Sequence, residues 1–405
     1  MGDARVSRSW FHGVKGSRTR YALHTAGQIL ILSPAILVCA ASLVIHRRRV
    51  GMVGRLSPVI SCFIPPLEAL LRSVSVEERR DWLILNMSRT DNHFVEQVYG
   101  RAVRILGSRE KWRRSSYLWA ARLTHRLYEL LEAKSDPAWM SRRHVIQLRR
   151  SETDAAWENV ERLGIDRDRP YVLVVSRHNA YYERLAREGV VVKGRAVRNP
   201  REETYLEAAL AFAASEKAQV VRIGRDMPPL ASSWTARGVV DYAGVGRTDE
   251  MDVVLASEAW FMLNGATGAF WLTEMFHRTQ VHGDVYDARH VQIDGSIFTL
   301  QRVRDVATGR LLTLREMLLH ESRYSDERHM ERLGLELVKN TRADLLGAMA
   351  EMVERLAGRW VDDPERVHRQ ATYRAIVAEY SSEPTWMGRG WPSDRFLIDN
   401  PDLLE

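Results

Sequence analysis

Short apolar strands alternate with helical segments between residues 170 and 285, and this alternation constrains the fold more than any other feature of the sequence. Pro170–Val175 is one continuous apolar run, which is typical of a strand buried on both faces. Pro200 is a favourable first residue for a helix over 201–216. Further strands are predicted at 218–223, 239–240, 260–263 and 280–282, with helices at 252–257 and 269–276. Strands that alternate with helices in this way indicate a parallel, doubly wound α/β sheet.

The regions on either side of this series have weaker patterns. A short strand is predicted at 82–85, followed by a helix that Thr90, Asp91 or Asn92 would cap and whose apolar stripe runs from Phe94 to Leu106. The remaining predictions are an amphipathic helix over 115–133, a weak strand at 144–148, a mostly helical part over 313–379 and an irregular tail over 380–405. The chain therefore holds enough elements for more than one α/β domain.

Composition excludes several classes of protein. The 405-residue chain is 45% hydrophobic and 27% charged, fractions that exclude global disorder and a polytopic membrane protein. Cys39 and Cys62 are the two cysteines, which excludes a disulfide framework and any cysteine-based zinc or iron–sulfur site.

The charge is distributed unevenly along the chain. Residues 1–150 contain 26 Lys and Arg against 11 Asp and Glu, whereas residues 151–405 contain 33 against 41. This asymmetry suggests two domains with different partners. No helix-turn-helix, zinc-finger or RNP signature supports nucleic-acid binding, so we expect an anionic membrane surface and no nucleic acid as the partner of the basic half.

An apolar segment near the N-terminus points to the same partner. Residues 29–45 contain no charged side chain, and arginines occupy positions 47–49 directly after them. The run is barely long enough to span a bilayer, and Pro34 would kink a helix there. No A-x-A cleavage site is evident for a signal peptide. Three interpretations stay open for 23–45: an in-plane or re-entrant anchor, which we favour, a spanning helix, and a buried core helix.

The membrane hypothesis extends to the residues that follow. The polybasic stretch would add an electrostatic contact, so we expect membrane binding through residues 23–55. Phe63–Leu67 is a candidate extension of the same surface. We expect the protein at the cytoplasmic face of the cell membrane, as a peripheral or monotopic protein.

Three of the predicted strands end in residues suited to phosphate. They are followed by Ser176–Tyr182, Arg222–Asp226 and Asn264–Gly268. Arginine forks match phosphate oxygens, and a helix start reached through small residues offers free N–H groups. Together they predict a diphosphate cradle built from Arg177, Arg222, Arg225, Asn264, Gly265, Thr267 and Gly268. Each motif also has a plainer explanation, since such arginines often form salt bridges and N-G-A-T-G often forms a plain turn.

Three further residues are candidates for nucleotide or sugar contacts. Asp241 and Tyr242 follow a strand and would present a backbone or a ring to a base; the alternative is that Asp241 caps a turn and Tyr242 lies in the core. Glu274 lies on the helix after Gly268 and would reach a ribose or sugar hydroxyl, or else belong to a solvated helix face.

Several common motifs are missing from the sequence. There is no Walker A motif, no H-E-x-x-H and no G-x-S-x-G. The D-x-D motif at Asp166–Asp168 precedes a strand instead of following one, so it is poorly placed to hold a metal–diphosphate. We therefore expect no metal and no cofactor.

The order of these motifs resembles a bacterial glycosyltransferase family that is distantly similar to fucosyltransferases with two Rossmann domains (GT-B). The motifs that carry the resemblance are VVSRHNAYY at 174–182, QVVRIGRDM at 219–227, VVDYAG at 239–244, WFMLNGATGAF at 260–270, RTDNHFV at 89–95, LLTLREM at 311–317 and SDRFLIDNPDLL at 393–404. Related enzymes tend to carry H-x-R and then an acidic residue at the first strand end, where this chain has Ser176–Asn179.

The resemblance covers the chain from about residue 50 onward and implies an α/β protein with two Rossmann-like domains, to which the apolar segment described above adds an N-terminal membrane-associating helix. We therefore expect a membrane segment at 1–50, an acceptor-side domain at 51–150, a donor domain at 151–300 and a helical region at 301–405 that packs back on them. Arg177, Arg222 and the turn Gly265–Gly268 would hold the diphosphate of a nucleotide sugar. His178, Glu183 and Asp91 are the unranked candidates for the base.

The implied function is metal-independent sugar transfer from a nucleotide-sugar donor to a cell-surface glycan, glycolipid or natural-product acceptor, as in polysaccharide biosynthesis. Arginine donors would stabilise the leaving diphosphate in place of a metal. Two alternatives stay open: a nucleotide-sugar epimerase or hydrolase of the same fold, and a non-catalytic membrane-associated scaffold.

Overall fold

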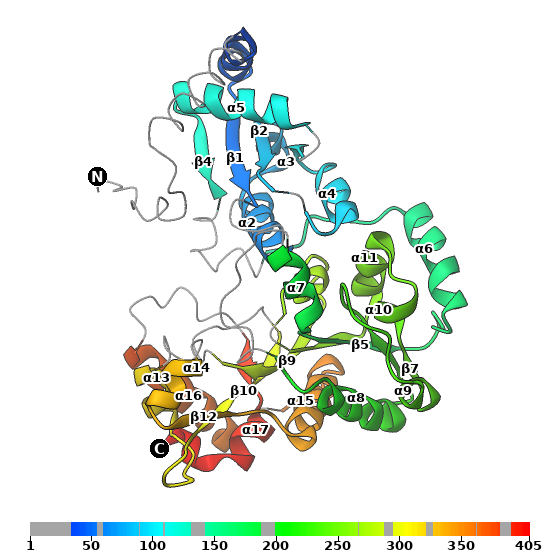
Figure 1. The fold of residues 1–405 in the computed structure, drawn as a ribbon, viewed down its shortest axis with the longest axis vertical. Coiled ribbons are helices and arrows are strands. Elements are labelled where there is room, and N and C mark those ends of the chain that lie inside the picture. The colour runs from blue at the N-terminus through cyan, green and yellow to red at the C-terminus, as the bar shows by residue number, and fades with distance from the viewer. Residues whose placement is uncertain are drawn as a thin grey trace.

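The chain folds into a mixed α/β structure with parallel sheets, in two lobes (Figure 1). The computed structural model describes residues 34–54, 60–88, 90–107, 110–130, 142–187, 199–265, 267–286, 295–320, 327–361, 363–380 and 390–405. We call residues 34–130 the N-terminal lobe and residues 150–405 the C-terminal lobe. Each lobe is built around its own parallel sheet.

The N-terminal lobe contains a four-stranded parallel sheet in the order β3-β2-β1-β4. Its strands are β1 (Arg49–Val53), β2 (Trp82–Asn86), β3 (Arg104–Leu106) and β4 (Leu127–Glu129). Its helices are 34–45, η2 (Ile60–Cys62), α2 (Ile64–Ser73), α3 (Val76–Arg79), α4 (His93–Tyr99) and α5 (Lys111–Leu123). Asn92 caps α4 by accepting the Val95 N–H, which confirms one of the predicted caps.

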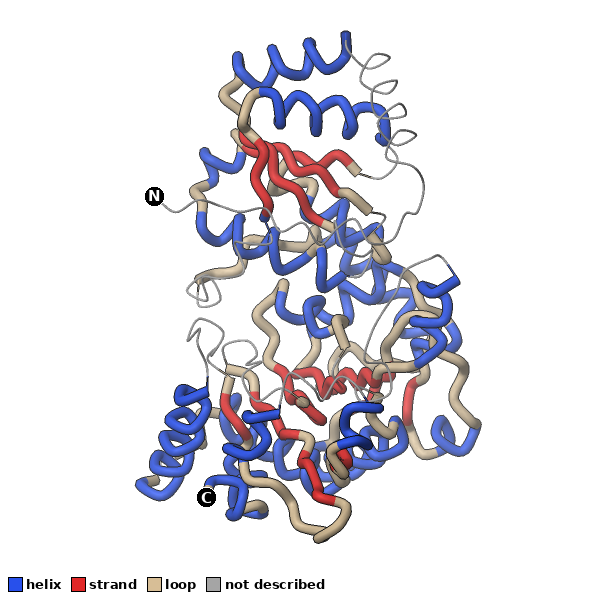
Figure 2. Tube along the Cα trace, turned by 60° about the vertical axis from the view of Figure 1, so that its left-hand side comes forward, coloured by secondary structure: helices blue, strands red, loops and turns tan. Residues whose placement is uncertain are grey.

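Helices cover both faces of this sheet (Figure 2). Val50 and Leu85 face the helix over 34–45 and α5, whereas Val53 and Ile84 face α2 and α4. The domain boundary predicted at residue 50 therefore falls inside β1, and the helix over 34–45 contributes Ile36 and Leu43 to the core of the lobe.

The C-terminal lobe contains a seven-stranded sheet in the order β13-β10-β9-β8-β5-β6-β7. Its strands are β5 (Tyr171–Ser176), β6 (Gln219–Arg222), β7 (Val239–Val240), β8 (Phe261–Gly265), β9 (Gln280–Val285), β10 (Ile297–Leu300) and β13 (Trp391–Pro392). All of its pairings are parallel. The chain moves outward from β5 to β7 on one side and from β8 to β10 on the other, so the strand order reverses between β5 and β8.

Helices cover both faces of this sheet as well. The helices of the lobe are α6 (Arg150–Arg162), α7 (Asn179–Arg187), α8 (Glu202–Glu216), α9 (Ser232–Ala236), α10 (Tyr242–Val245), α11 (Asp249–Glu258), α12 (Phe270–Glu274), α13 (Leu314–His320), α14 (Glu327–Arg332), α15 (Arg342–Leu356), α16 (Pro364–Tyr380), α17 (Asp394–Asp399) and η9 (Pro401–Leu404). In β5, Val172 and Val174 pack with α8 and α15, and Leu173 and Val175 with α6 and α11. The continuous apolar run at 170–175 reflects this burial on both sides.

The region after residue 300 continues the same lobe. β11 (Arg302–Asp305) pairs with β12 (Leu335–Val338) in an antiparallel ribbon, and β13 completes the large sheet beside β10. The tail predicted to be irregular thus holds β13 and α17, and Phe396 of α17 is buried.

Some local predictions were wrong. The helix predicted over 115–133 is α5, which ends at Leu123 and is followed by β4, and 144–148 forms no strand. Phe63–Leu67 is buried at the start of α2, so it extends no membrane surface. Residues 23–33 lie outside the described part of the chain. Among the residues described, none of the helices has both the length and the apolar character needed to cross a bilayer.

Candidate functional site

The carboxyl ends of the two parallel sheets meet at the junction between the lobes. After β1, the Gly54 N–H donates to the Cys62 carbonyl at 3.2 Å, and Ser61 beside it lies against Gly268, which follows β8. After β2, Asp91 accepts a hydrogen bond from Tyr181 of α7, the helix that follows β5. The switch point between β5 and β8 therefore faces the carboxyl edge of the N-terminal sheet.

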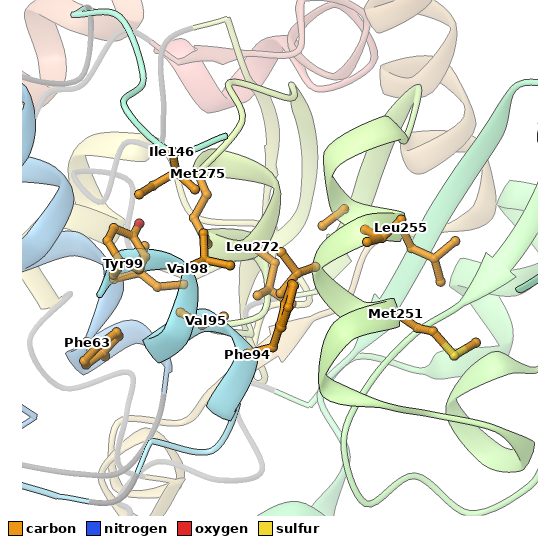
Figure 3. Packing of buried hydrophobic residues seen from close by; sticks show 14 of the residues in the cluster. Phe63, Phe94, Val95, Val98, Tyr99, Ile146, Met251, Leu255, Leu272 and Met275 are labelled. Carbon is orange, nitrogen blue, oxygen red and sulfur yellow. The ribbon is translucent and has the colours of Figure 1, made fainter. Parts of the chain in front are cut away.

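A hydrophobic core runs across this junction (Figure 3). Phe94, Val95 and Val98 of α4 belong to the same buried cluster as Leu272 and Met275 of the C-terminal lobe. Polar contacts flank this core, because Asn92 donates to the Asp249 carbonyl at 3.0 Å and the His93 N–H donates to the Asp249 carboxylate at 2.8 Å. The lobes are thus held together by packing as well as by hydrogen bonds.

Arg177 directly follows β5 at the switch point. It is buried, and its guanidinium lies 3.9 Å from the centre of the Tyr182 ring on α7. A cation over the face of an aromatic ring is held through the ring quadrupole, so this contact does not itself use the N–H groups at the edge of the guanidinium. The structure places Arg177 where open α/β sheets bind their ligands.

The geometry of His178 bears on its predicted role as a base. Its Nδ1 accepts the Ala180 N–H at 3.1 Å, so in the neutral ring the proton is on Nε2. A ring in this state donates a hydrogen bond through Nε2 and has no lone pair left for a substrate proton. The arrangement therefore favours His178 as a hydrogen-bond donor over His178 as the base.

The two carboxylate candidates for the base differ in their surroundings. Asp91 is buried and accepts hydrogen bonds from the Tyr181 hydroxyl and from Arg184, whose Nη2 is 3.2 Å away. Burial and the Asp91 charge raise the pKa of Tyr181 well above its ordinary value, so Tyr181 stays a donor. Glu183 lies on the exposed side of α7.

Arg222 ends β6 and is enclosed by the protein's own carboxylates. Its Nε and Nη2 donate to Glu202 at 2.8 and 3.2 Å, and its Nη1 donates to Asp241 at 2.7 Å. Burial alone lowers the pKa of Arg222, but the two carboxylates outweigh it and the pKa is raised. Ser176 also donates to Glu202, at 2.9 Å. This geometry favours the alternative in which Arg222 ties the strand ends together over a diphosphate contact.

The neighbouring candidates belong to similar internal contacts. Asp241 caps α10 and Tyr242 is fully buried, as in the plainer of the two explanations. Arg225 lies 3.4 Å from Asp249, within the polar contacts that join the lobes. Glu202, which holds Arg222, was missed because nothing near it in the sequence marks it as the partner of a strand end.

The turn after β8 has a buried polar group of its own. The amide nitrogen of Asn264 lies 2.8 Å from Nδ1 of His282, and its amide oxygen accepts a hydrogen bond from the Thr267 hydroxyl at 3.2 Å. A Cβ on Gly265 would come within 2.7 Å of Pro200, and one on Gly268 within 3.1 Å of Ser61. Packing against the chain itself accounts for both glycines. His282 was not among the predicted site residues.

Glu274 lies between the lobes and away from solvent. Its carboxylate accepts from Arg72 Nη1 of α2 at 3.1 Å, and Arg72 also donates to Glu68. Burial raises the pKa of Glu68, against the opposing effect of Arg72. Glu274 therefore does not lie on a solvated helix face, and that alternative is wrong. Its carboxylate forms an ion pair across the junction instead of the predicted contact with a sugar hydroxyl.

Two further features lie away from the switch point. Asp166–Asp168 precedes β5, as predicted, at the opposite edge of the sheet. A groove of about 820 Å³ runs beside β6 and β7 and is lined by residues such as Lys217, Gln219 and Gly238. Within the described ranges, no group of three or more His, Cys, Asp or Glu side chains is arranged to hold a metal ion, and metal independence stays a prediction.

The switch point of the large sheet, faced by a second parallel sheet, is thus the candidate site. Arg177, His178, Asn264 and Asp91 lie there, at three strand ends in two lobes. Comparison with known proteins adds no family to this description: no family model, no curated protein and no solved structure matches the chain.

Proposed function

We propose that this protein is a metal-independent glycosyltransferase of the two-Rossmann type, with its nucleotide-sugar donor at the carboxyl ends of β5 and β8. One observation carries the proposal: the switch point of a sheet in Rossmann order faces the carboxyl edge of a second parallel sheet. Ligands of open α/β sheets bind at such reversals of strand order. The second lobe would present the acceptor, a cell-surface glycan, glycolipid or natural product.

The chemistry requires little more than charge stabilisation and one base. The bond between the anomeric carbon and the diphosphate oxygen breaks, a bond to the acceptor oxygen forms, and the acceptor proton passes to a base. Arg177 and His178 would donate to the leaving diphosphate in place of a metal ion. Asp91 and Glu183 remain the two candidates for the base, since the acceptor nitrogen of His178 is already in use.

Thermal-shift measurements with UDP-, GDP-, dTDP- and CMP-linked sugars test the donor site. We expect stabilisation by one nucleotide class, lost in Arg177→Ala. Arg167→Ala is the matched control, because Arg167 precedes β5 at the opposite edge and also lies over an aromatic ring, that of Trp157 at 5.3 Å. If both variants lose the thermal stabilisation equally, or if neither loses it, the nucleotide sugar does not bind at the switch point.

Product analysis separates the alternatives. Transfer to an acceptor supports the proposal. Donor hydrolysis or epimerisation without transfer would favour a nucleotide-sugar epimerase or hydrolase, and a folded protein that binds no nucleotide at all would favour the scaffold.

A further inference from the structure

The helix over 34–45 presents an apolar face to solvent. Ile36 and Leu43 are buried against the N-terminal lobe, so this helix lies along the lobe through most of its length. The residues on its outer side are exposed and every one of them is apolar: Pro34, Ala35, Leu37, Val38, Ala41, Val44 and Ile45. Val38 and Ile45 retain 71% and 73% of their accessible surface, which is unusual for neighbouring aliphatic side chains.

The charged side chains near this face are mostly basic. Residues 34–49 and 111–126, which include this helix, the start of β1 and α5, contain eight lysines and arginines and no carboxylate, and Glu110 directly before α5 pairs with Arg113 at 2.7 Å. His46, Arg47, Lys111 and Arg122 are exposed. The helix and α5 lie at the same end of the molecule (Figure 1), and α5 adds exposed Trp112 and Leu123.

We propose that this end of the N-terminal lobe docks on an anionic lipid bilayer, with the helix over 34–45 lying in the plane of the interface. An apolar face with exposed lysine and arginine beside it matches the acyl boundary and the charged headgroups of such a surface at the same time. A soluble protein partner would need carboxylates opposite the exposed cations as well as an apolar groove. The inference is independent of the reaction proposed above.

Flotation of the purified full-length protein with vesicles tests this docking. We expect binding to phosphatidylcholine vesicles that contain phosphatidylglycerol, and much weaker binding to phosphatidylcholine alone. The double variant Val38→Gln/Ile45→Gln should lose roughly tenfold or more in partitioning, because both side chains enter the apolar boundary. Arg47→Gln should lose about fivefold, on anionic vesicles only.

A matched control removes exposed aliphatic side chains elsewhere. Val245 and Val361 are 65% and 72% exposed on the C-terminal lobe, and Val245→Gln/Val361→Gln should float as the unsubstituted protein does. Equal flotation of both double variants would place the contact elsewhere and overturn the proposal. It also fails if Val38→Gln/Ile45→Gln lowers the melting temperature or abolishes self-association without vesicles, because the face would then be covered by the chain itself or by a second copy.

Discussion

Two neighbouring strands of the large sheet have an arginine at or directly after their end, and the two arginines have different surroundings. Arg222 after β6 is enclosed by Glu202 and Asp241, whereas Arg177 after β5 lies over the ring of Tyr182 at the point where the strand order reverses. In the sequence, Arg222 directly follows Val220 and Val221, whereas Ser176 stands between the apolar run and Arg177. The difference lies in what distant segments bring to each strand end: two carboxylates in one case and an aromatic ring in the other.

Substitution of Arg222 tests the structural half of this comparison and has the largest expected effect. Arg222→Ala leaves the buried Asp241 and the partly buried Glu202 without their cation, so the free energy of unfolding should fall by about 3–5 kcal/mol, the range for a broken buried ion pair. Urea denaturation measures this loss. Unchanged stability together with lost nucleotide binding would return Arg222 to the diphosphate cradle.

Substitution of Arg177 tests the second half of the comparison, the proposed contact with a nucleotide sugar. Arg177→Ala should weaken nucleotide-sugar binding by about 1.5–3 kcal/mol, the range for a hydrogen bond to a charged group. Its melting temperature should stay close to that of the unsubstituted protein, and isothermal calorimetry gives the affinity. Arg177→Lys should recover part of the binding, because an ammonium keeps the charge and loses the fork.

His178 refines the comparison at the same strand end. Because its Nδ1 is occupied, we expect a donor role that a glutamine amide can replace, so His178→Gln should keep most of the activity. His178→Ala should lose about 1 kcal/mol of transition-state stabilisation. If the two variants lose activity equally, in steady-state assays of the transfer reaction, His178 acts as the base after all.

An exposed ion pair provides the comparison that shows how much burial adds to the stability contributed by the ion pairs of Arg222. Arg310 and Glu316 form the same two-pronged contact, at 2.9 and 2.7 Å, on the protein surface. Arg310, above all, lowers the pKa of Glu316 from 4.5 to about 2, so its contribution is present above pH 4.5 and is lost as the pH falls through 2. Glu316→Gln should cost about 1 kcal/mol or less in urea denaturation at pH 7, because water screens the pair. A loss as large as that of Arg222→Ala would show that pairing outweighs burial.

The sequence predicted the strands of the large sheet better than those of the small one. β5, β6 and β8 are buried on both faces, and the short apolar stretch in each of them is enough to predict a strand from the local sequence alone. β3 and β4 have three residues each and lie beside helical patterns, so their side chains were assigned to helices. Only their pairing with β2 and β1 makes them strands.

The candidate site was predictable in position and less so in its contacts. The parallel direction of the strands was predicted from the alternating elements, and with it the edge at which Arg177, His178 and Asn264 lie. The partners of Arg222 and Glu274 come from other helices, since Glu202 begins α8 and Arg72 belongs to α2 of the other lobe. No local pattern reveals which carboxylate will meet which arginine after folding.

The last strand of the large sheet also determines where that sheet stops. The N–H groups of Trp391 and Ser393 both point inward, to the carbonyls of Ser296 and Phe298 beside β10. The residue between them is Pro392, at the position whose N–H would point outward. Because proline has no N–H, this edge lacks the donor that an incoming strand from another molecule would need. Pro392 thus protects the β13 edge of the sheet against strand addition.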